Sequence, residues 1–218
     1  MTTRAVVFDI PGVLVEWRPE RLYARLIADE AQRARFLREI CPPGWTAPFD
    51  RGAPTPEGVE AHALAHPAEA ELIRAWWSRW PEMFGPAIPG AAALLRALKA
   101  AGRPTFGLSD FPAETFEIAR RLYPFLDRLD LVVTSAQVGA IKPEPAIYAA
   151  LEARCGFAPE ALLLVDAGPA SVAAARARGW RAHLHRGVGG LTRALTASGL
   201  LAPHQLPRVP APRRAPPG

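Results

Sequence analysis

The sequence predicts an α/β fold, a Rossmann-like parallel sheet with crossover helices that is interrupted by an all-helical insert. Short apolar runs alternate with helical stretches over most of the chain, at residues 5–9, 104–109, 130–134 and 161–166. This alternation is expected when parallel strands are joined by helices that cross back over the sheet. The segment 15–87 breaks the alternation, because it shows helical periodicity and no strand signal.

The first predicted strand ends in a carboxylate. The apolar run 5–8 is followed by Asp9, and Pro11-Gly12 ends the strand two residues later. In an open α/β sheet, ligands bind beyond the carboxyl ends of the strands. An Asp at that edge suits a nucleophile, a metal ligand or a ribose partner, although an acid after a buried strand also commonly begins an ordinary turn.

The insert reads as a series of helices between the first and second core strands. A charged helical run spans residues 20–40, Pro42-Pro43-Gly44 breaks it, and a tryptophan-rich helix covers residues 69–80. Tryptophans at helical spacing usually pack in a core, and we expect one or two to line a substrate pocket. The tryptophans of this region are Trp17, Trp45, Trp76, Trp77 and Trp80.

Two histidines of the insert, His62 and His66, stand four residues apart and can share a helix face. No Glu in a zinc-protease pattern lies between them, and Pro67 follows, so a metal site is not expected here.

The later elements complete the alternation. Pro89-Gly90 opens a helix that runs through Lys99, and further helices are predicted over residues 143–153 and 171–178. Residues 180–185 form the last predicted strand.

The composition favours a globular protein with a disordered tail. The chain has 218 residues, half of them hydrophobic, which is enough for one ordinary domain with a small insert. Residues 202–218 are rich in Pro and Arg, so this tail is expected to be disordered or extended. The formal charge of +5 comes partly from that tail, and no basic stripe with interleaved aromatics accompanies it. Nucleic acid is therefore not an expected partner.

Cysteine use and hydropathy favour a cytoplasmic protein. Cys41 and Cys155 lie outside any CxxC pattern and have no His at zinc spacing, so both are predicted to be reduced thiols. The N-terminus runs directly into a strand with no signal-peptide pattern, and no apolar stretch approaches the length of a membrane span. We expect no association with a membrane, and the sequence leaves protein partners and oligomeric state open.

Four segments carry a specific resemblance to a known family. They are the strand that ends at Asp9, Leu108-Ser109-Asp110-Phe111-Pro112-Ala113-Glu114-Thr115-Phe116, Lys142-Pro143-Glu144-Pro145-Ala146-Ile147-Tyr148, and the strand that ends at Asp166. In order and spacing they resemble the four motifs of the haloacid dehalogenase-like (HAD) hydrolase superfamily, in the branch with a helical cap after the first motif. The resemblance covers about residues 4–201. It implies a core of residues 1–14 and 88–201, with residues 15–87 as the helical cap.

The resemblance also implies roles for the matching residues. Asp9 corresponds to the nucleophile, and Ser109 to the hydroxyl that donates to a phosphoryl or carboxylate oxygen. Lys142 would neutralise charge between Asp9 and the transferring group. Ser109, Asp110 and Lys142 are thus the candidate substrate-binding residues, and Asp9 and Asp166 the candidate ligands of Mg²⁺.

Four positions depart from the family pattern. Pro11 replaces the acid that protonates the leaving group, although its carbonyl oxygen can still ligate a metal. Asp110 stands where close relatives carry Asn, so it would repel a phosphate or serve as a substitute metal ligand. Ala167 replaces the second acid of the fourth motif, and Ser171 stands where relatives often carry Asn. We therefore expect Mg²⁺ to bind weakly or not at all.

These observations favour a HAD-like hydrolase that cleaves a phosphate monoester of a small anionic metabolite through Asp9, with low or impaired activity. Two alternatives remain open. A metal-free haloacid dehalogenase needs neither Mg²⁺ nor the second acid, but the asparagine and water-activating acid usual in that branch are not evident after Asp166. A catalytically inactive HAD fold that serves as a binding or regulatory protein would explain why the departures cluster at the site.

Overall fold

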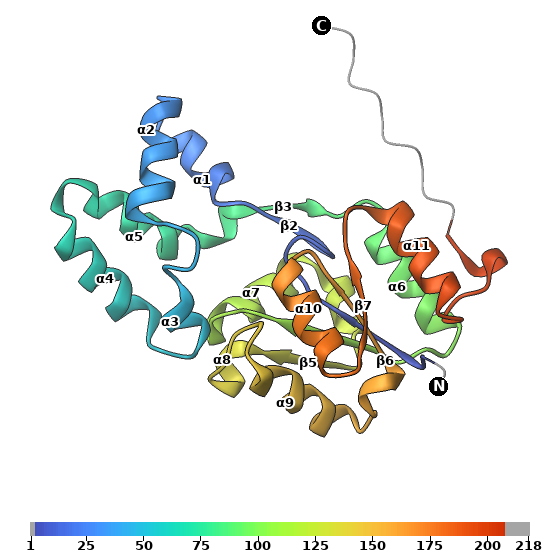
Figure 1. The fold of residues 1–218 in the computed structure, drawn as a ribbon. Coiled ribbons are helices and arrows are strands. Elements are labelled where there is room, and N and C mark those ends of the chain that lie inside the picture. The colour runs from blue at the N-terminus through green and yellow to red at the C-terminus, as the bar shows by residue number, and fades with distance from the viewer. Residues whose placement is uncertain (1–2, 208–218) are drawn as a thin grey trace, which may run out of the picture.

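The structure, a computed structural model, describes residues 3–207, and within that range five strands form one parallel sheet (Figure 1). Every hydrogen-bonded pair of neighbouring strands in it is parallel. The strands lie in the order β5 (Leu131–Thr134), β4 (Thr105–Ser109), β1 (Ala5–Phe8), β6 (Leu162–Asp166) and β7 (Arg181–Leu184). The predicted α/β class is confirmed.

The register of the three central strands brings their carboxyl ends level. Phe8 lies opposite Gly107 in β4 and Val165 in β6. Asp9, the next residue, therefore stands at the same edge as the last residues of β4 and β6, and its N–H donates to the carbonyl of Val165 at 2.9 Å. This edge is where ligands bind in open α/β sheets.

Alternate side chains of β1 point to opposite faces of the sheet, and helices cover each face. The helices of the core are α6 (Ala91–Ala100), α7 (Ala113–Leu122), α8 (Ser135–Val138), α9 (Pro145–Cys155), α10 (Pro169–Ala177) and α11 (Val188–Ala197). Val6 and Phe8 belong to an apolar cluster with α6 and α11, whereas Ala5 and Val7 belong to a second cluster with α9 and α10.

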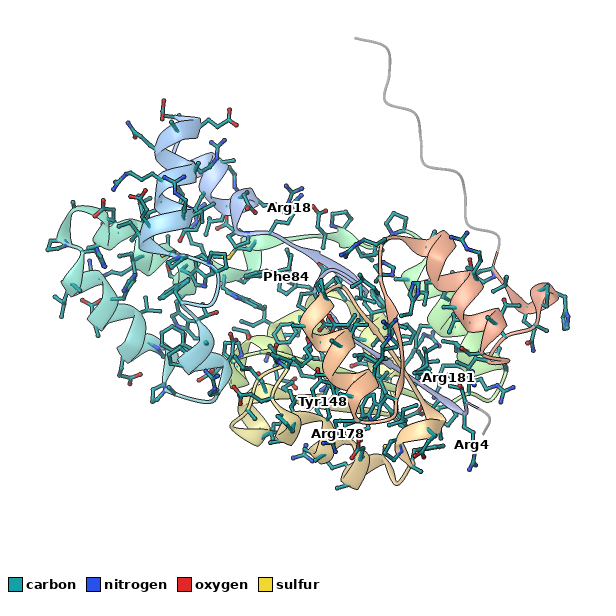
Figure 2. The ribbon with its side chains drawn as sticks, viewed as in Figure 1. Arg4, Arg18, Phe84, Tyr148, Arg178 and Arg181 are labelled. Atoms are coloured by element: carbon teal, nitrogen blue, oxygen red, sulfur yellow. The ribbon has the colours of Figure 1, made fainter. Side chains whose placement is uncertain are left out.

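Polar contacts fix α9 against its neighbours. Tyr148 packs edge-on against Trp180, with ring centroids 5.6 Å apart, and its hydroxyl donates to the carbonyl of Ser171 at 3.1 Å (Figure 2). Glu152 accepts from Arg178 at 2.7 Å and from the indole N–H of Trp180 at 2.6 Å. These contacts fix α9, which follows the loop that carries Lys142, against Ser171, Arg178 and Trp180.

The insert is helical between residues 19 and 83 and lies to one side of the sheet in Figure 1. Its predicted helical run over residues 20–40 is divided, because the side chain of Asp29 begins a new helix by accepting from the N–H of Gln32. The helices are α1 (Pro19–Leu26), α2 (Glu30–Arg35), α3 (Ala47–Asp50), α4 (Thr55–Ala65) and α5 (Ala70–Ser78), with a π-helical turn at Phe36–Ile40 and 3₁₀ turns at Pro67–Glu69 and Trp80–Met83.

Two short strands frame the insert, where the sequence predicted none. β2 (Val15–Trp17) pairs antiparallel with β3 (Phe84–Ala87). The prediction was wrong here because strands of three and four residues are too short to show alternation, and because Gly85 and Pro86 are unfavourable in strands. Through this pairing, the two segments that connect the insert to the core lie side by side.

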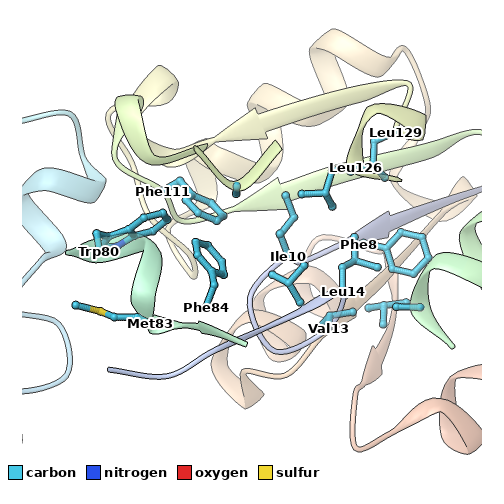
Figure 3. Close-up of a cluster of buried hydrophobic side chains, with 14 of the residues drawn as sticks. Phe8, Ile10, Val13, Leu14, Trp80, Met83, Phe84, Phe111, Leu126 and Leu129 are labelled. Atoms are coloured by element: carbon cyan, nitrogen blue, oxygen red, sulfur yellow. The ribbon is translucent and has the colours of Figure 1, made fainter. Parts of the chain in front are cut away.

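One apolar cluster continues from the core into the insert (Figure 3). Trp80 packs edge-on against Phe84 and Phe111, with ring centroids 4.8 Å and 5.9 Å apart. Phe111 directly follows the second motif, and Phe84 begins β3. The cluster therefore fixes the insert against the loop that carries Ser109 and Asp110.

The end of the described chain differs in part from the predicted tail. Pro203–Gln205 forms a 3₁₀ turn, and the side chain of Gln205 accepts from the N–H of Ala202 at 2.8 Å. The rest of the predicted disordered segment, residues 208–218, lies outside the described residues. Cys41 and Cys155 are free thiols. Within residues 3–207, none of the helices has the length and hydropathy needed to cross a bilayer.

Candidate active site

The structure brings together the four residues that the motifs singled out. Asp9 follows β1, Ser109 ends β4, Asp166 ends β6, and Lys142 lies in the loop between α8 and α9. The ammonium Nζ of Lys142 is 2.9 Å from Asp9 Oδ1 and 2.8 Å from Asp166 Oδ2. The parallel order of the strands explains this convergence, because their carboxyl ends meet at one edge.

Asp9 has one engaged and one free carboxylate oxygen. Its Oδ1 accepts from Ser109 Oγ at 2.7 Å and from the N–H of Ile10 at 2.8 Å, and it also pairs with Lys142. Its Oδ2 accepts no hydrogen bond from residues 3–207. Burial raises the pKa of Asp9 to about 6, with the charge of Asp166 adding to the rise and Lys142 and Ser109 opposing it. The engaged oxygen holds the carboxylate in place, which leaves Oδ2 available to react.

Lys142 is a buried cation that the surrounding acids keep charged. Its side chain is 4% exposed. Burial alone would lower the pKa of Lys142, but the carboxylates of Asp9, Asp166 and Asp110 outweigh burial and hold its pKa above the ordinary value. A fixed positive charge at this place can stabilise negative charge that develops on a ligand.

Asp110 supports the loop that carries Lys142. Its Oδ1 accepts from the backbone N–H of Lys142 at 3.0 Å. Burial raises the pKa of Asp110, and the charge of Lys142 opposes the rise. The sequence did not indicate this contact, since it joins two loops that are 32 residues apart.

Asp166 is turned inward, with both oxygens engaged. Its Oδ2 pairs with Lys142, and its Oδ1 accepts from the N–H of Gly168 at 2.6 Å. Its side chain is 2% exposed. The neighbouring side chain, Ala167, faces the first-motif loop, because a Cβ built on Gly12 would lie 3.5 Å from the Cβ of Ala167.

The donor set does not fit a tightly held Mg²⁺. This cation prefers octahedral oxygen coordination from one or two carboxylates and waters. Asp166 already uses both oxygens, Ala167 supplies none, and Lys142 places a positive charge between the two acids. Among the residues that the structure describes, no group of three His, Cys, Asp or Glu side chains is arranged to hold a metal.

A cavity of about 260 Å³ lies between the core edge and the insert. The core contributes polar side chains from Asp9, Ser109, Asp110 and Lys142 to its wall. The insert and its hinge contribute a wall that is mostly aromatic, formed by Trp17, Thr46, Phe49, Asp50, Thr55, Trp76, Trp77 and Trp80. More tryptophans line the cavity than the sequence predicted, because they come from both ends of the insert.

The two histidines of the insert pack against neighbouring rings. The ring of His62 stacks on Trp45 and contacts His66, with ring centroids 5.1 Å and 4.7 Å away. A ring nitrogen of His62 is 2.7 Å from the carbonyl oxygen of Ile40. Neither histidine lines the cavity beside Asp9.

Asp50 is a cavity residue that no motif revealed. It ends the short helix α3, and its Oδ2 accepts from Thr46 Oγ1 at 3.0 Å. Burial, together with the charge of Asp110, raises the pKa of Asp50 to about 6 against the opposing effects of Thr46 and Arg51. A carboxyl of this kind changes protonation close to neutral pH.

We predict that Asp50→Asn stabilises the protein at pH 8 and leaves stability unchanged at pH 4. The folded chain holds the Asp50 proton more tightly than the unfolded chain, whose Asp pKa is about 3.9. The stability that this proton contributes is present below that unfolded value and is lost as pH rises through about 6. The difference at pH 8 should be about 1–3 kcal/mol after allowance for partial exposure.

Thermal or urea unfolding of both chains at the two pH values measures this difference. Asp127→Asn, which removes a surface acid paired with Arg120, is the matched control and should not stabilise the protein at pH 8. An equal effect of Asp50→Asn at pH 4 and pH 8 would contradict the raised pKa of Asp50.

Comparisons with known proteins agree with this fold. A family model for haloacid dehalogenase-like hydrolases matches residues 3–179. The chain is similar to a predicted HAD-like family hydrolase from Porphyromonas gingivalis, with 21% identity, a TM-score of 0.68, and coverage of 89% of this chain and 98% of that chain. No curated protein matches the sequence.

Two further solved structures are similar. A HAD family enzyme from Bacteroides thetaiotaomicron, in complex with magnesium and inorganic phosphate, has 16% identity, a TM-score of 0.64, and coverage of 85% of this chain and 95% of that chain. A HAD phosphatase from Thermococcus onnurineus has 26% identity, a TM-score of 0.59, and coverage of 83% and 85%, respectively.

Proposed function

Because this chain belongs to the haloacid dehalogenase-like hydrolase family, and is therefore a hydrolase, we propose that it cleaves phosphate monoesters of small metabolites through Asp9 as the nucleophile. The proposal rests on the position and hydrogen bonding of the Asp9 carboxylate. Its Oδ1 is fixed by Ser109 and Ile10, its Oδ2 is free, and the residue lines a cavity of metabolite size.

The reaction would proceed in two steps. Asp9 Oδ2 attacks phosphorus, the bond to the leaving oxygen breaks, and an aspartyl phosphate forms. Water then attacks this phosphorus and releases inorganic phosphate with regeneration of the carboxylate. Lys142 offsets negative charge on the phosphoryl oxygens, and Ser109 can redirect its hydroxyl from Asp9 to one of them.

The substrate class follows from the two walls of the cavity. The polar wall of the core suits a small anion, because Lys142 supplies a positive charge in that wall. The phosphate complex of the similarly folded enzyme from Bacteroides thetaiotaomicron and the similar phosphatase from Thermococcus onnurineus support a phosphate ester as the substrate. The aromatic wall of the insert would hold the remainder of the molecule.

We further propose that activity is low. Position 11 is a proline, so it supplies no proton to the leaving group, and general acid catalysis is typically worth about 10²–10⁴-fold. Asp110 places a carboxylate beside the substrate, where relatives carry an amide. The metal ligand at position 167 is missing as well.

We propose that Mg²⁺ is bound weakly or not at all, and predict that Ala167→Asp tightens its binding by about tenfold or more. The new carboxylate would face the first-motif loop, where Asp9 and the Pro11 carbonyl can share the ion. Calorimetric titration of Mg²⁺ into both chains measures the change. Ala170→Asp, which adds the same charge at an exposed position of α10, is the control. Micromolar affinity in the native chain would refute the proposal.

A metal-free dehalogenase reaction is the second candidate, and the unsuitability of the donor set for Mg²⁺ favours it. There Asp9 would attack carbon rather than phosphorus. A panel of phosphate esters and 2-haloacids, assayed with and without Mg²⁺ on the native chain and Asp9→Asn, separates the candidates. Phosphate release that depends on Asp9 supports the phosphatase, and halide release that depends on Asp9 supports the dehalogenase. Release of neither would leave the fold as a binding module.

A further inference from the structure

We propose that Asp50 of the insert is the proton donor to the leaving group and so replaces the acid that position 11 lacks. This inference rests on the proposed phosphatase function. It would make Asp50 a catalytic residue supplied by the insert rather than by the strand that carries the nucleophile.

The direction of the reaction places the leaving group beside the insert. The phosphoryl group must contact Asp9, Ser109 and Lys142, which form the core wall of the cavity. Phosphoryl transfer runs roughly in line, so the leaving oxygen lies opposite Asp9, toward the insert. Among the described residues that line the cavity from the insert side, Asp50 is the one that carries a titratable side chain.

The end of α3 is anchored to the core at the catalytic edge. Arg51, the next residue, forms an ion pair with Glu144, which lies two residues after Lys142. Gly52 has φ +96°, and a Cβ there would lie 3.2 Å from the carbonyl oxygen of Ala136 in α8. Figure 1 shows α3 beside α8 accordingly. The position of Asp50 is therefore set by the same loops that position Lys142.

The surroundings of Asp50 suit a proton donor. Thr46 orients its carboxyl group, Phe49 precedes it in the cavity wall, and Asp110 faces it from the core as a like charge. The only cation beside it, Arg51, pairs with Glu144 within the described structure. Burial and the charge of Asp110 raise the pKa of Asp50 to about 6, so a share of the carboxyl is protonated near neutral pH.

Protons and electrons are conserved over the two steps of the reaction. In the first, the electron pair of the breaking P–O bond goes to the leaving oxygen, which takes the proton of Asp50 and departs as an alcohol. In the second, water attacks the phosphorus, its proton passes to the Asp50 carboxylate, and the Asp9–phosphorus bond breaks. Both groups return to their initial states.

The test compares two substrates on the native chain and Asp50→Asn. Glycerol 1-phosphate has a poor leaving group that needs a proton, whereas 4-nitrophenyl phosphate has a good one that does not. We expect kcat/KM of Asp50→Asn to fall about 10²-fold or more for glycerol 1-phosphate and only a few-fold for 4-nitrophenyl phosphate. Glu57→Gln, which removes an exposed carboxylate of α4, is the control and should change neither value.

Asp50→Glu keeps the acid and should retain more alkyl phosphate activity than Asp50→Asn, and circular dichroism melts confirm that each variant is folded. An equal fall for both substrates, or no fall, overturns the role of Asp50 while leaving Asp9 as nucleophile. If the native chain hydrolyses neither ester, or hydrolyses them as fast when Asp9 is replaced by Asn, the proposed function itself fails and this inference falls with it.

Discussion

Asp9→Asn is expected to reduce phosphate monoester hydrolysis to the background rate. The amide cannot serve as the attacking group, and loss of a covalent nucleophile typically removes a factor of about 10³ or more even when the rest of the site is intact. The site should stay assembled, because Asn can still accept from Ser109 and Ile10. Lys142 also keeps its pairing with Asp166. The loss should therefore appear in kcat with little change in the unfolding temperature.

Phosphate release from 4-nitrophenyl phosphate measures this loss, at several enzyme concentrations so that a slow native rate is resolved from contamination. Asp127→Asn is the matched control, since it removes a surface carboxylate that pairs with Arg120 away from the cavity. A folded Asp9→Asn chain with native activity would show that another residue attacks the substrate.

Restoring residues of the family pattern should instead raise the phosphatase activity. We expect Pro11→Asp combined with Ala167→Asp to raise alkyl phosphate hydrolysis, and to do so by about 10²–10⁴-fold in the Asp50→Asn background, where position 11 replaces the missing general acid. Position 167 regains a ligand for the metal that offsets phosphate charge. The structure favours both replacements, since Pro11 lines the cavity and Ala167 faces Gly12. Pro11 also fixes its own φ, so each variant must be checked for folding.

Asp110→Asn should add to this gain. An amide at position 110 can keep the hydrogen bond from the N–H of Lys142 through its oxygen and can also donate to a phosphate. The assay is hydrolysis of glycerol 1-phosphate, whose leaving group needs a proton, at saturating Mg²⁺. A folded triple variant that stays at background would mean that the departures do not limit catalysis. A native chain that is already as fast would mean that Asp9 works with a different acid.

Combining Asp50→Asn with Pro11→Asp tests whether the two acids perform the same proton transfer. If Asp50 and the acid introduced by Pro11→Asp perform the same proton transfer, Asp50→Asn should cost alkyl phosphate hydrolysis less in the Pro11→Asp background than in the native chain. Residues that share one function are non-additive in this way.

The convergence of the motif residues at one edge of the sheet could be predicted from the sequence. Apolar runs that end in Asp9, Ser109 and Asp166 are local patterns, and the rule that strand ends share an edge converts them into a three-dimensional site. Lys142 was predicted from its motif context. The state of Asp166 was not predictable, because its inward turn depends on Lys142 and on the N–H of Gly168.

The insert wall of the cavity could not be predicted from the sequence. Asp50 ends a helix of four residues, which is too short to show periodicity. Its helix meets the core through long-range contacts, such as the close approach of Gly52 to Ala136, that no local pattern reveals. Thr55 gave no signal either, since an isolated Thr carries no spacing information. The strands β2 and β3, which set where the insert leaves the core, were missed because of their length.

The most direct test of Asp9 as nucleophile is mass spectrometry of the native chain after acid quench during turnover of 4-nitrophenyl phosphate. We predict that the peptide containing Asp9 gains the mass of one phosphoryl group, and that this adduct is absent from Asp9→Asn. Steady phosphate release with no adduct on that peptide, and with Asp9→Asn still active, would contradict it.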